Sequence, residues 1–490
     1  MPEASFEFSN SYARLPDRFF ARQNPDPVAH PELIKLNLEL AETLGLDFAL
    51  PPADIAQMFA GNTLPTGAEP ISLAYAGHQF GGWVPQLGDG RAVLLGEVVD
   101  AEGIRRDIQL KGSGRTPFSR GGDGRAALGP VMREYIVSEA MHAMGVPTTR
   151  ALCAVKTGEE VLREGFLPGA ILTRIASSHV RVGTFEYFAS RSDEEGVRTL
   201  ADYVIERHYP DAKDADQPYM ALLGHVVSRQ ARLVAKWFQL GFIHGVMNTD
   251  NTSVAGETID YGPCAFMDEY HPRTVFSSID QMGRYAFGNQ ASVLQWNLAQ
   301  LAQCLVSIVE LEMDDAVALA QAEVDAFPAK FEAELIKGLR AKLGLQGEKD
   351  GDLALAFELL EVMASDRTDF TNTFRDLADV LDGNADKARS HFKDTTTFDG
   401  WLSRWLDRVA EDGRPLTDAA KAMRTVNPAV IPRNHLVEAA IRAGEDNDDF
   451  EPFNALIDEV TRPFDARPDH SKYIRPPEPE EVVHQTFCGT

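Results

Sequence analysis

The fold is decided by the stretch His244-Gly245-Val246-Met247-Asn248-Thr249-Asp250-Asn251, together with Asp260-Tyr261-Gly262 a short way downstream. Asn251 and Asp260 supply an amide and a carboxylate, and Mg²⁺ takes such oxygen ligands where it also bridges phosphates. Asp250, next to Asn251, is a carboxylate that can serve as a general base. The two stretches therefore predict a phosphate-binding site with Asn251 and Asp260 as metal ligands.

The spacing of these residues is that of a kinase with one part missing. Kinases place a base Asp five residues before a metal-binding Asn and take a second metal ligand from an Asp-Phe-Gly turn. Here the position five before Asn251 (251 − 5 = 246) holds Val246, which cannot accept a proton. The metal ligands are kept, the usual base is not, and His244 is expected to structure the loop rather than bind metal.

The order of the other elements also fits a kinase. Two short strands are predicted around a Gly-rich turn within residues 83–99, then a strand over 104–111 and a helix from about Pro130 to Met141. Helical spacing occurs over residues 31–40, 221–240, 290–345 and 352–382. We expect an α+β, two-lobed protein-kinase-like fold with an N-terminal extension and a helical C-terminal region.

The same pattern suggests four parts. Residues 1–70 are expected to be an extension that packs on the core, and 71–165 an N-lobe with the Gly-rich turn, the Lys and the helix Glu. Residues 166–345 are expected to be a C-lobe with the catalytic and metal loops, and 346–490 a helical region with a Pro/Glu tail. The length of 490 residues allows two to four domains.

Several residues upstream could bind phosphate. Gly88 and Gly90 flank a turn whose N–H groups can approach an anion closely, although such turns are common. Lys111 ends a predicted strand and Glu134 follows 23 residues later (134 − 111) on a helix, the order of the kinase Lys–Glu pair. Each residue alone is as well explained by a solvated side chain, so it is their order that favours the site.

Positive charge gathers in the same region. The segment 105–133 has seven basic residues and few acidic ones, namely Arg105, Arg106, Lys111, Arg115, Arg120, Arg125 and Arg133 against Asp107 and Asp123. Arg174 and Arg181 lie in apolar, strand-like stretches and so need partners. A polyphosphate and structural salt bridges both remain open as those partners.

Composition limits the classes of partner. The net charge is −27 (47 − 74) and the pI is about 4.8, which argues against nucleic acid or an anionic membrane. No apolar run reaches the ~18 residues of a membrane span, and the start of the chain lacks a signal-peptide pattern. We expect a cytoplasmic protein. Its four cysteines lack metal spacing, although a Cys264–Cys488 pair would tie the tail to the loop after Asp260.

The sequence resembles the selenoprotein O family over most of its length. The resemblance is carried by Ala76-Gly77-His78-Gln79-Phe80-Gly81-Gly82-Trp83, by Gln86-Leu87-Gly88-Asp89-Gly90-Arg91-Ala92, by Gln109-Leu110-Lys111-Gly112-Ser113-Gly114, by Arg120-Gly121-Gly122-Asp123-Gly124-Arg125-Ala126 and by both opening stretches. It implies a kinase-like protein adenylyltransferase of a family first taken for pseudokinases. Such an enzyme would bind ATP in a flipped orientation and transfer AMP to Ser, Thr or Tyr hydroxyls of proteins. Eukaryotic members carry selenocysteine near the C-terminus, where this chain has Cys488.

The resemblance also implies residue roles. The nucleotide contacts would be Gly88, Gly90, Arg91, Lys111, Asp123, Gly124, Arg174, Arg181 and Asp260. Glu134 would pair with the lysine, Asp250 would accept the proton, and Asn251 with Asp260 would bind Mg²⁺, with Mn²⁺ as an alternative. Redox-related proteins are among the implied targets. In the flipped orientation pyrophosphate leaves, and Lys111, Arg174 and Arg181 can receive its charge.

Two other functions are compatible with the residues. A small-molecule phosphotransferase shares the His-Gly pair and the downstream Asn, but Val246 speaks against it. A catalytically dead ATP-binding scaffold would not need the complete set of Lys111, Glu134, Asn251 and Asp260, although a fold can keep such residues for binding alone. The target proteins and the choice between ATP and UTP stay open, as does the oligomeric state, for which a monomer is expected.

Overall fold

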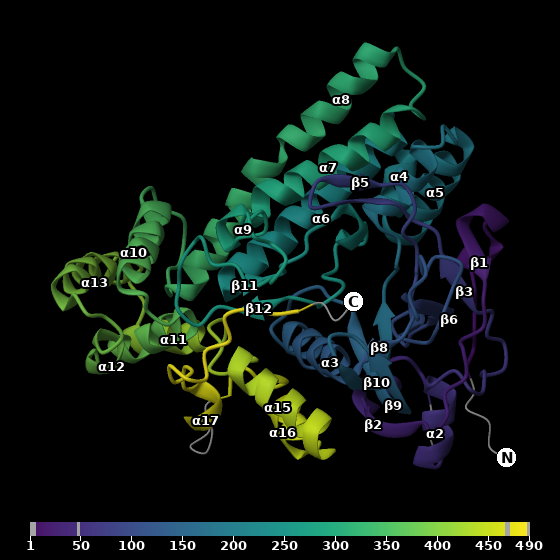
Figure 1. The fold of residues 1–490 in the computed structure, drawn as a ribbon. Coiled ribbons are helices and arrows are strands. Elements are labelled where there is room, and N and C mark those ends of the chain that lie inside the picture. The colour runs from purple at the N-terminus through teal and green to yellow at the C-terminus, as the bar shows by residue number, and fades with distance from the viewer. Residues whose placement is uncertain (1–5, 47–49, 466–470, 488–490) are drawn as a thin grey trace.

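The computed structural model describes residues 6–46, 50–465 and 471–487. A β-sheet region and a larger helical region make up the chain, an α+β arrangement, as expected (Figure 1). Within the described residues, none of the helices is long and apolar enough to cross a bilayer.

The sheet has eight strands, and its main order is β1-β3-β6-β7-β10-β9-β2, with β8 paired to β10. The strands are β1 (Phe20–Arg22), β2 (Glu32–Leu36), β3 (Ile71–Leu73), β6 (Ala92–Val99), β7 (Arg105–Lys111), β8 (Ala126–Ala127), β9 (Arg150–Leu162) and β10 (Phe166–Ala176). Strand β6 is buried at every position except its last, because both faces of the sheet are covered. Two short hairpins complete the β structure, β4 (Gly77–Gln79) with β5 (Gly82–Val84) and β11 (Phe242–Ile243) with β12 (Ala265–Phe266).

The helices cover the sheet and build the rest of the molecule. They are α1 (Leu38–Thr43), α2 (Pro52–Phe59), α3 (Leu128–Ala143), α4 (Val182–Ala189), α5 (Glu194–His208), α6 (Pro218–Leu240), α7 (Gln290–Val306), α8 (Met313–Asp325), α9 (Phe327–Lys342), α10 (Asp352–Asp366), α11 (Phe370–Leu381), α12 (Asp386–Arg389), α13 (Thr395–Ala410), α14 (Leu416–Arg424), α15 (Asn434–Asn447), α16 (Glu451–Val460) and α17 (Ser471–Ile474). Helix α3 packs on β9 and β10, and α15 and α16 return from the C-terminal region to pack against α3.

Helix α6 precedes the segment 244–251 that carries the candidate base and Asn251. It has an apolar face that is buried, and it ends at Gly241, whose left-handed φ of 70° lets the helix stop sharply. Strand β11 follows at once and pairs with β12, with Phe242 opposite Phe266. The segment between these two paired strands contains both Asn251 and Asp260, so these two residues lie in the same part of the fold.

Two predictions of local structure are wrong. Residues 31–40, expected to be helical, form β2 and then the start of α1, because β2 pairs antiparallel with β9 at the edge of the sheet. The strands within residues 83–99 do not form one hairpin, since β5 pairs with β4 whereas β6 pairs with β3 and β7. In the first case pairing with a distant strand overrides a helical pattern read from neighbouring residues, and in the second each strand pairs with a neighbour other than the expected one.

The structure also bears on the expected division into four parts. The boundary at 165 falls between β9 and β10, which are two strands of one antiparallel hairpin. The sheet therefore continues to Ala176. Residues 1–70 supply β1 and β2 to that sheet rather than only packing on it. The division between residues 345 and 346 falls after α9 and before α10.

Candidate active site

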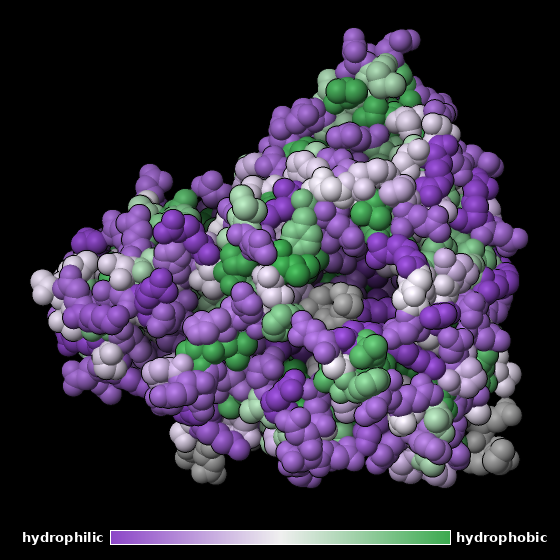
Figure 2. Space-filling view, in the orientation of Figure 1, coloured by the Kyte–Doolittle hydropathy of each residue, from purple (hydrophilic) through white to green (hydrophobic). Residues whose placement is uncertain are grey.

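A cleft of about 840 Å³ lies between the sheet and the helical region, and this size suits a nucleotide-sized ligand. Its lining includes the predicted residues Gly88, Gly90, Arg91, Lys111, Asp123, Gly124, Glu134, Arg174, Arg181, Asp250, Asn251 and Asp260. The face of the molecule drawn in Figure 2 is mainly hydrophilic and is hollowed near its centre. Residues more than 170 positions apart in the sequence thus meet in one cavity (260 − 88 = 172).

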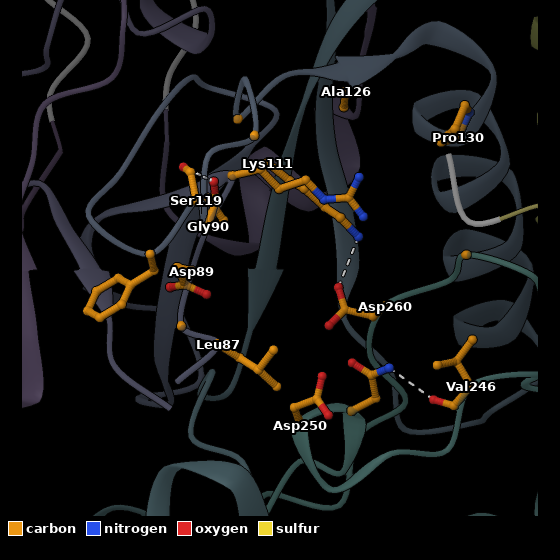
Figure 3. A pocket seen from close by; sticks show the side chains of 18 of the residues that line it. Leu87, Asp89, Gly90, Lys111, Ser119, Ala126, Pro130, Val246, Asp250 and Asp260 are labelled. Atoms are coloured by element: carbon orange, nitrogen blue, oxygen red, sulfur yellow. Dashed lines mark hydrogen bonds and ion pairs between the residues drawn. The ribbon is translucent and has the colours of Figure 1, made fainter. Parts of the chain in front are cut away.

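Asp260 is the centre of the charges in this cleft. Its Oδ1 accepts from Lys111 Nζ at 2.9 Å and from Arg174 Nη1 at 2.6 Å, and its Oδ2 accepts from Arg181 Nη1 at 2.6 Å. Figure 3 shows Lys111 reaching toward Asp260, with Asp250 lying below Asp260 on the side away from Lys111. Three cations therefore converge on one carboxylate.

Glu134 holds two of these cations from the other side. Its Oε2 accepts from Lys111 Nζ at 2.5 Å, and its Oε1 accepts from Arg174 Nη1 at 3.2 Å. Lys111 ends β7 directly opposite Leu172 of β10, and Glu134 comes from the buried middle of α3. The predicted Lys–Glu pair is present in the structure, because α3 packs on the sheet that carries the lysine.

Burial raises the pKa of Asp260, but the charges of Lys111, Arg174 and Arg181 outweigh burial, so the pKa lies well below its ordinary value. Asp260 is therefore ionised. Its backbone has a φ of +63°, a left-handed conformation that costs free energy for any residue but glycine. Such strain in a cleft is typical of a residue whose placement serves function.

Arg181 differs from the prediction in its local structure. It does not lie in a strand but directly precedes α4, in extended backbone. Its guanidinium is almost fully buried, donates to the backbone O of Asp250 at 2.6 Å and lies 4.7 Å from the ring centre of Tyr75. Arg181 thereby connects the Asp260 carboxylate to the backbone of Asp250.

Asp250 has the properties of a general base. It is 6 % exposed, and burial raises its pKa to about 6, although Arg181 acts in the opposite direction. Its Oδ1 is buried without a hydrogen-bond partner among the described residues. A carboxylate with a raised pKa and a free oxygen can accept a proton from a substrate hydroxyl.

Val246, which stands five residues before Asn251 in the sequence, lines the cleft. Its carbonyl oxygen accepts from Asn251 Nδ2 at 2.9 Å, which leaves the Asn251 amide oxygen to face a cation. His244 is buried: its Nε2 donates to Ile259 O at 2.8 Å, and its Nδ1 accepts from the Val246 N–H at 3.3 Å. Both ring nitrogens are used inside the protein, and this agrees with the expected structural role of His244.

The glycine-rich turn is shaped by Phe118. A Cβ atom at Gly88 would overlap the Phe118 ring, and one at Gly90 would lie 2.8 Å from the Phe118 carbonyl oxygen. Asp89 between them is buried and accepts from the Leu73 N–H and from Gln109. The turn is thus fixed against the loop 112–125 rather than free at a hairpin tip.

The loop 112–125 forms one wall of the cleft. Asp123 accepts two hydrogen bonds from Arg163, which lower the pKa of the aspartate. Gly124 packs so closely on Gly114 that a side chain would not fit. Three arginines of the predicted basic segment form ion pairs within the protein and are not free to bind an anion. Arg105 pairs with Glu97, Arg106 with Asp100 and Arg133 with Glu438.

The tail returns to the edge of this site. Thr486 Oγ1 donates to Pro263 O at 2.7 Å, and the Thr486 N–H donates to Phe276 O at 2.8 Å. Cys264 is buried in the loop after Asp260. Cys488 lies outside the described residues, so the Cys264–Cys488 pair stays a prediction.

The donor set for a metal is small. Among the residues that the structure describes, no group of three or more His, Cys, Asp and Glu side chains could hold a metal ion. The predicted set of one amide and one carboxylate, Asn251 and Asp260, does not need such a group, because phosphate oxygens and water complete the shell of Mg²⁺. These two residues fit Mg²⁺ in the presence of a polyphosphate.

Some lining residues were not predicted as part of a site. Tyr75, Gln79, Phe118 and Ile279 all contribute to the cleft. The run 76–83 is long and distinctive, but only the folded structure brings it to Asp250. Ile279 comes from an irregular segment whose sequence gives no periodic signal.

The cleft, its paired cations and its candidate base define an enzyme that handles a nucleotide. Residues 2–461 match the family described as "Protein adenylyltransferase SelO". The chain is 60% identical over 487 residues to a "Protein nucleotidyltransferase YdiU" of Bradyrhizobium sp. (strain ORS 278), with 99% of both chains covered. It is 57% identical over 491 residues to a protein of the same name from Rhizobium etli, covering 100% of this chain and 98% of the relative. This chain belongs to the SelO family and is a nucleotidyltransferase.

Proposed function

We propose that the protein transfers AMP from ATP to Ser, Thr or Tyr hydroxyls of other proteins, within a kinase-like fold that binds ATP in a flipped orientation. The names of the family and of the relatives support a protein substrate and an adenylyl group. The acidic composition favours a cytoplasmic location and argues against nucleic acid as the acceptor.

The observation that carries the proposal is the placement of the charges. A valine replaces the kinase base, while Asp250 offers a buried oxygen without a partner. Lys111, Arg174 and Arg181 converge on Asp260, and Glu134 binds two of them. Three cations thus face two carboxylates, and a polyphosphate can neutralise the excess positive charge. A leaving pyrophosphate, with its high negative charge, needs such a cluster more than a single transferred phosphoryl group does.

The steps follow from these positions. Asp250 takes the proton of the acceptor hydroxyl, whose oxygen attacks the α-phosphorus; the bond from this phosphorus to the bridging oxygen breaks. The products are a protein–AMP phosphodiester and pyrophosphate. The β- and γ-phosphates take up hydrogen bonds from Lys111, Arg174 and Arg181 that Asp260 accepts in their absence. Mg²⁺, held by Asn251 and Asp260, would neutralise charge on the phosphates when bound. Gly88, Gly90, Arg91, Asp123 and Gly124 complete the nucleotide site.

ATP labelled at either the α- or the γ-phosphate tests the function. The full chain is incubated with Mg²⁺, each labelled ATP and a nucleotide-depleted bacterial lysate as the source of acceptor proteins. We expect α-label on protein and no γ-label. Protein-bound γ-label would instead indicate a phosphotransferase, and neither label would indicate a binding scaffold.

Restoring the kinase base is expected not to restore a kinase. In Val246→Asp a carboxylate stands where kinases have it, but the arginines still direct the β- and γ-phosphates away from that position. We expect no transfer of γ-label above the parent protein and a loss of α-label transfer, because a second carboxylate lies near Asp250. Appearance of γ-label on protein would contradict the flipped orientation.

A further inference from the structure

The β4–β5 hairpin, residues 77–84, lies on the catalytic loop. His78 N–H donates to Thr249 Oγ1 at 2.7 Å, Gln79 Nε2 to Asp250 Oδ2 at 3.2 Å, and Phe80 N–H to Asn248 Oδ1 at 3.1 Å. Three consecutive hairpin residues thus bind three consecutive loop residues, a contact that connects parts of the chain more than 165 positions apart.

The hairpin leaves Asp250 little freedom. Gly77 lies against its carboxylate so closely that a Cβ atom there would be 2.6 Å from Oδ1 and 2.9 Å from the Asp250 Cβ. Among the described residues, Gln79 is the side chain that donates to this carboxylate, and it binds Oδ2. Oδ1 is thereby the oxygen left without a partner.

A second layer of contacts fixes the hairpin itself. Glu186 of α4 binds His78 Nδ1 at 2.6 Å through one oxygen and accepts from Thr249 Oγ1 at 2.5 Å through the other. Tyr285 donates to Asn248 Oδ1 at 2.5 Å and its ring packs on Phe80. Phe80 and Gly81 form the turn with φ of 52° and 82°, and the strained Phe80 is kept in place by these contacts.

We propose that Gln79 is a positioning residue, which fixes the orientation of the Asp250 carboxylate through Oδ2 so that this group can take the proton of the acceptor hydroxyl, with His78, Glu186 and Thr249 as its support. The inference rests on the proposed role of Asp250 as the base. Gln79 acts through this carboxylate and not on the phosphates, since the cations that meet the polyphosphate lie on Asp260. Its loss affects the chemical step and not ATP binding.

The test compares Gln79→Glu with Gln79→Ala. The glutamate keeps the size of the side chain but cannot donate, so a residue that only fills space would tolerate it. Initial rates of α-label incorporation into the lysate proteins are measured over a range of ATP concentrations. We expect kcat to fall about tenfold or more in both variants, as for a lost hydrogen bond to a charged group, with KM for ATP within about twofold of the parent.

The control is Gln86→Glu, which makes the same charge change at an exposed residue outside the described lining of the cleft. It should keep the parent kcat, and all variants should keep the parent thermal midpoint. If Gln79→Glu keeps the parent kcat, or if only KM for ATP changes, the positioning role is refuted while AMP transfer stands. If the parent protein transfers no α-label, the proposed function itself fails and the inference fails with it.

Discussion

Replacing Asp260 by asparagine is expected to reduce AMP transfer at least about a hundredfold, the scale seen when a preorganised charge contact is removed from an active site. The amide keeps the shape of the side chain but loses the charge that Lys111, Arg174 and Arg181 share. It is also a poorer ligand for Mg²⁺ than a carboxylate. The measurement is α-label incorporation at saturating ATP. Activity within tenfold of the parent would refute the assignment of Asp260 to the active site.

The same change is expected to lower stability in the absence of ATP. Lys111 and Arg174 keep Glu134 as a partner. Arg181 keeps the backbone O of Asp250 and the ring of Tyr75 but no ion-pair partner among the described residues. A buried cation that loses its carboxylate costs about 3 kcal/mol. Asp407→Asn, at an exposed position of α13, is the matched control and should leave stability within about 0.5 kcal/mol of the parent.

A double variant separates charge balance from catalysis. Arg174→Met in the Asp260→Asn background removes one of the excess cations, so it should recover part of the lost stability and none of the activity. The interaction free energy between the two changes is measured by denaturant unfolding of the four proteins. Simple additivity would show that Arg174 and Asp260 are not coupled, contrary to the 2.6 Å contact between them.

The charges of the site were more predictable than its geometry. The spacing within residues 244–262 predicts Asn251 and Asp260 as metal ligands, and the order of Lys111 and Glu134 on a strand and a helix predicts that they pair. These are local patterns, and the structure confirms the ion pair. The sequence does not show that Arg174 and Arg181 meet the same carboxylate. That contact depends on where the fold places β10 and the segment before α4 relative to Asp260.

Contacts made only by tertiary pairing were missed. Residues 31–40 have helical spacing, yet β2 forms because the edge of β9 offers it hydrogen bonds. The run 76–83 stands out in the sequence only as part of the family resemblance, and its role depends on the contacts that Gly77 and Gln79 make with Asp250. Arg105, Arg106 and Arg133 looked like part of an anion site, and each has a carboxylate partner that the sequence alone does not show.

Lys342 is expected to make the stability of the protein depend on pH. This last residue of α9 is 3 % exposed, and its ammonium lies 4.2 Å from the ring centre of Phe374 and 5.4 Å from that of Phe370. Burial lowers the pKa of Lys342 to about 7, and no carboxylate of the described residues forms an ion pair with its ammonium. A lysine in the unfolded chain titrates near pH ~10.4.

The sign follows from these two values. Between about pH 7 and pH 10 the unfolded chain binds a proton that the folded chain does not, so stability rises with pH across this range. Below pH 7 both states are protonated and the cost of burying the charge is complete. Lys342→Met removes the charge at similar volume, and we expect it to stabilise the protein at pH 6 by about 2–4 kcal/mol, given 1.36 kcal/mol per pKa unit and an offset from the aromatic rings.

Denaturant midpoints at pH 6, 7.5 and 9.5 test this expectation. The gain from Lys342→Met should be largest at pH 6 and should shrink toward pH 9.5, where the parent lysine is already neutral in the folded state. Lys337→Met, at an exposed position of the same helix, should show little gain at any of the three values. A gain for Lys342→Met that is equal at pH 6 and pH 9.5 would mean that better packing, and not removal of a buried charge, is responsible.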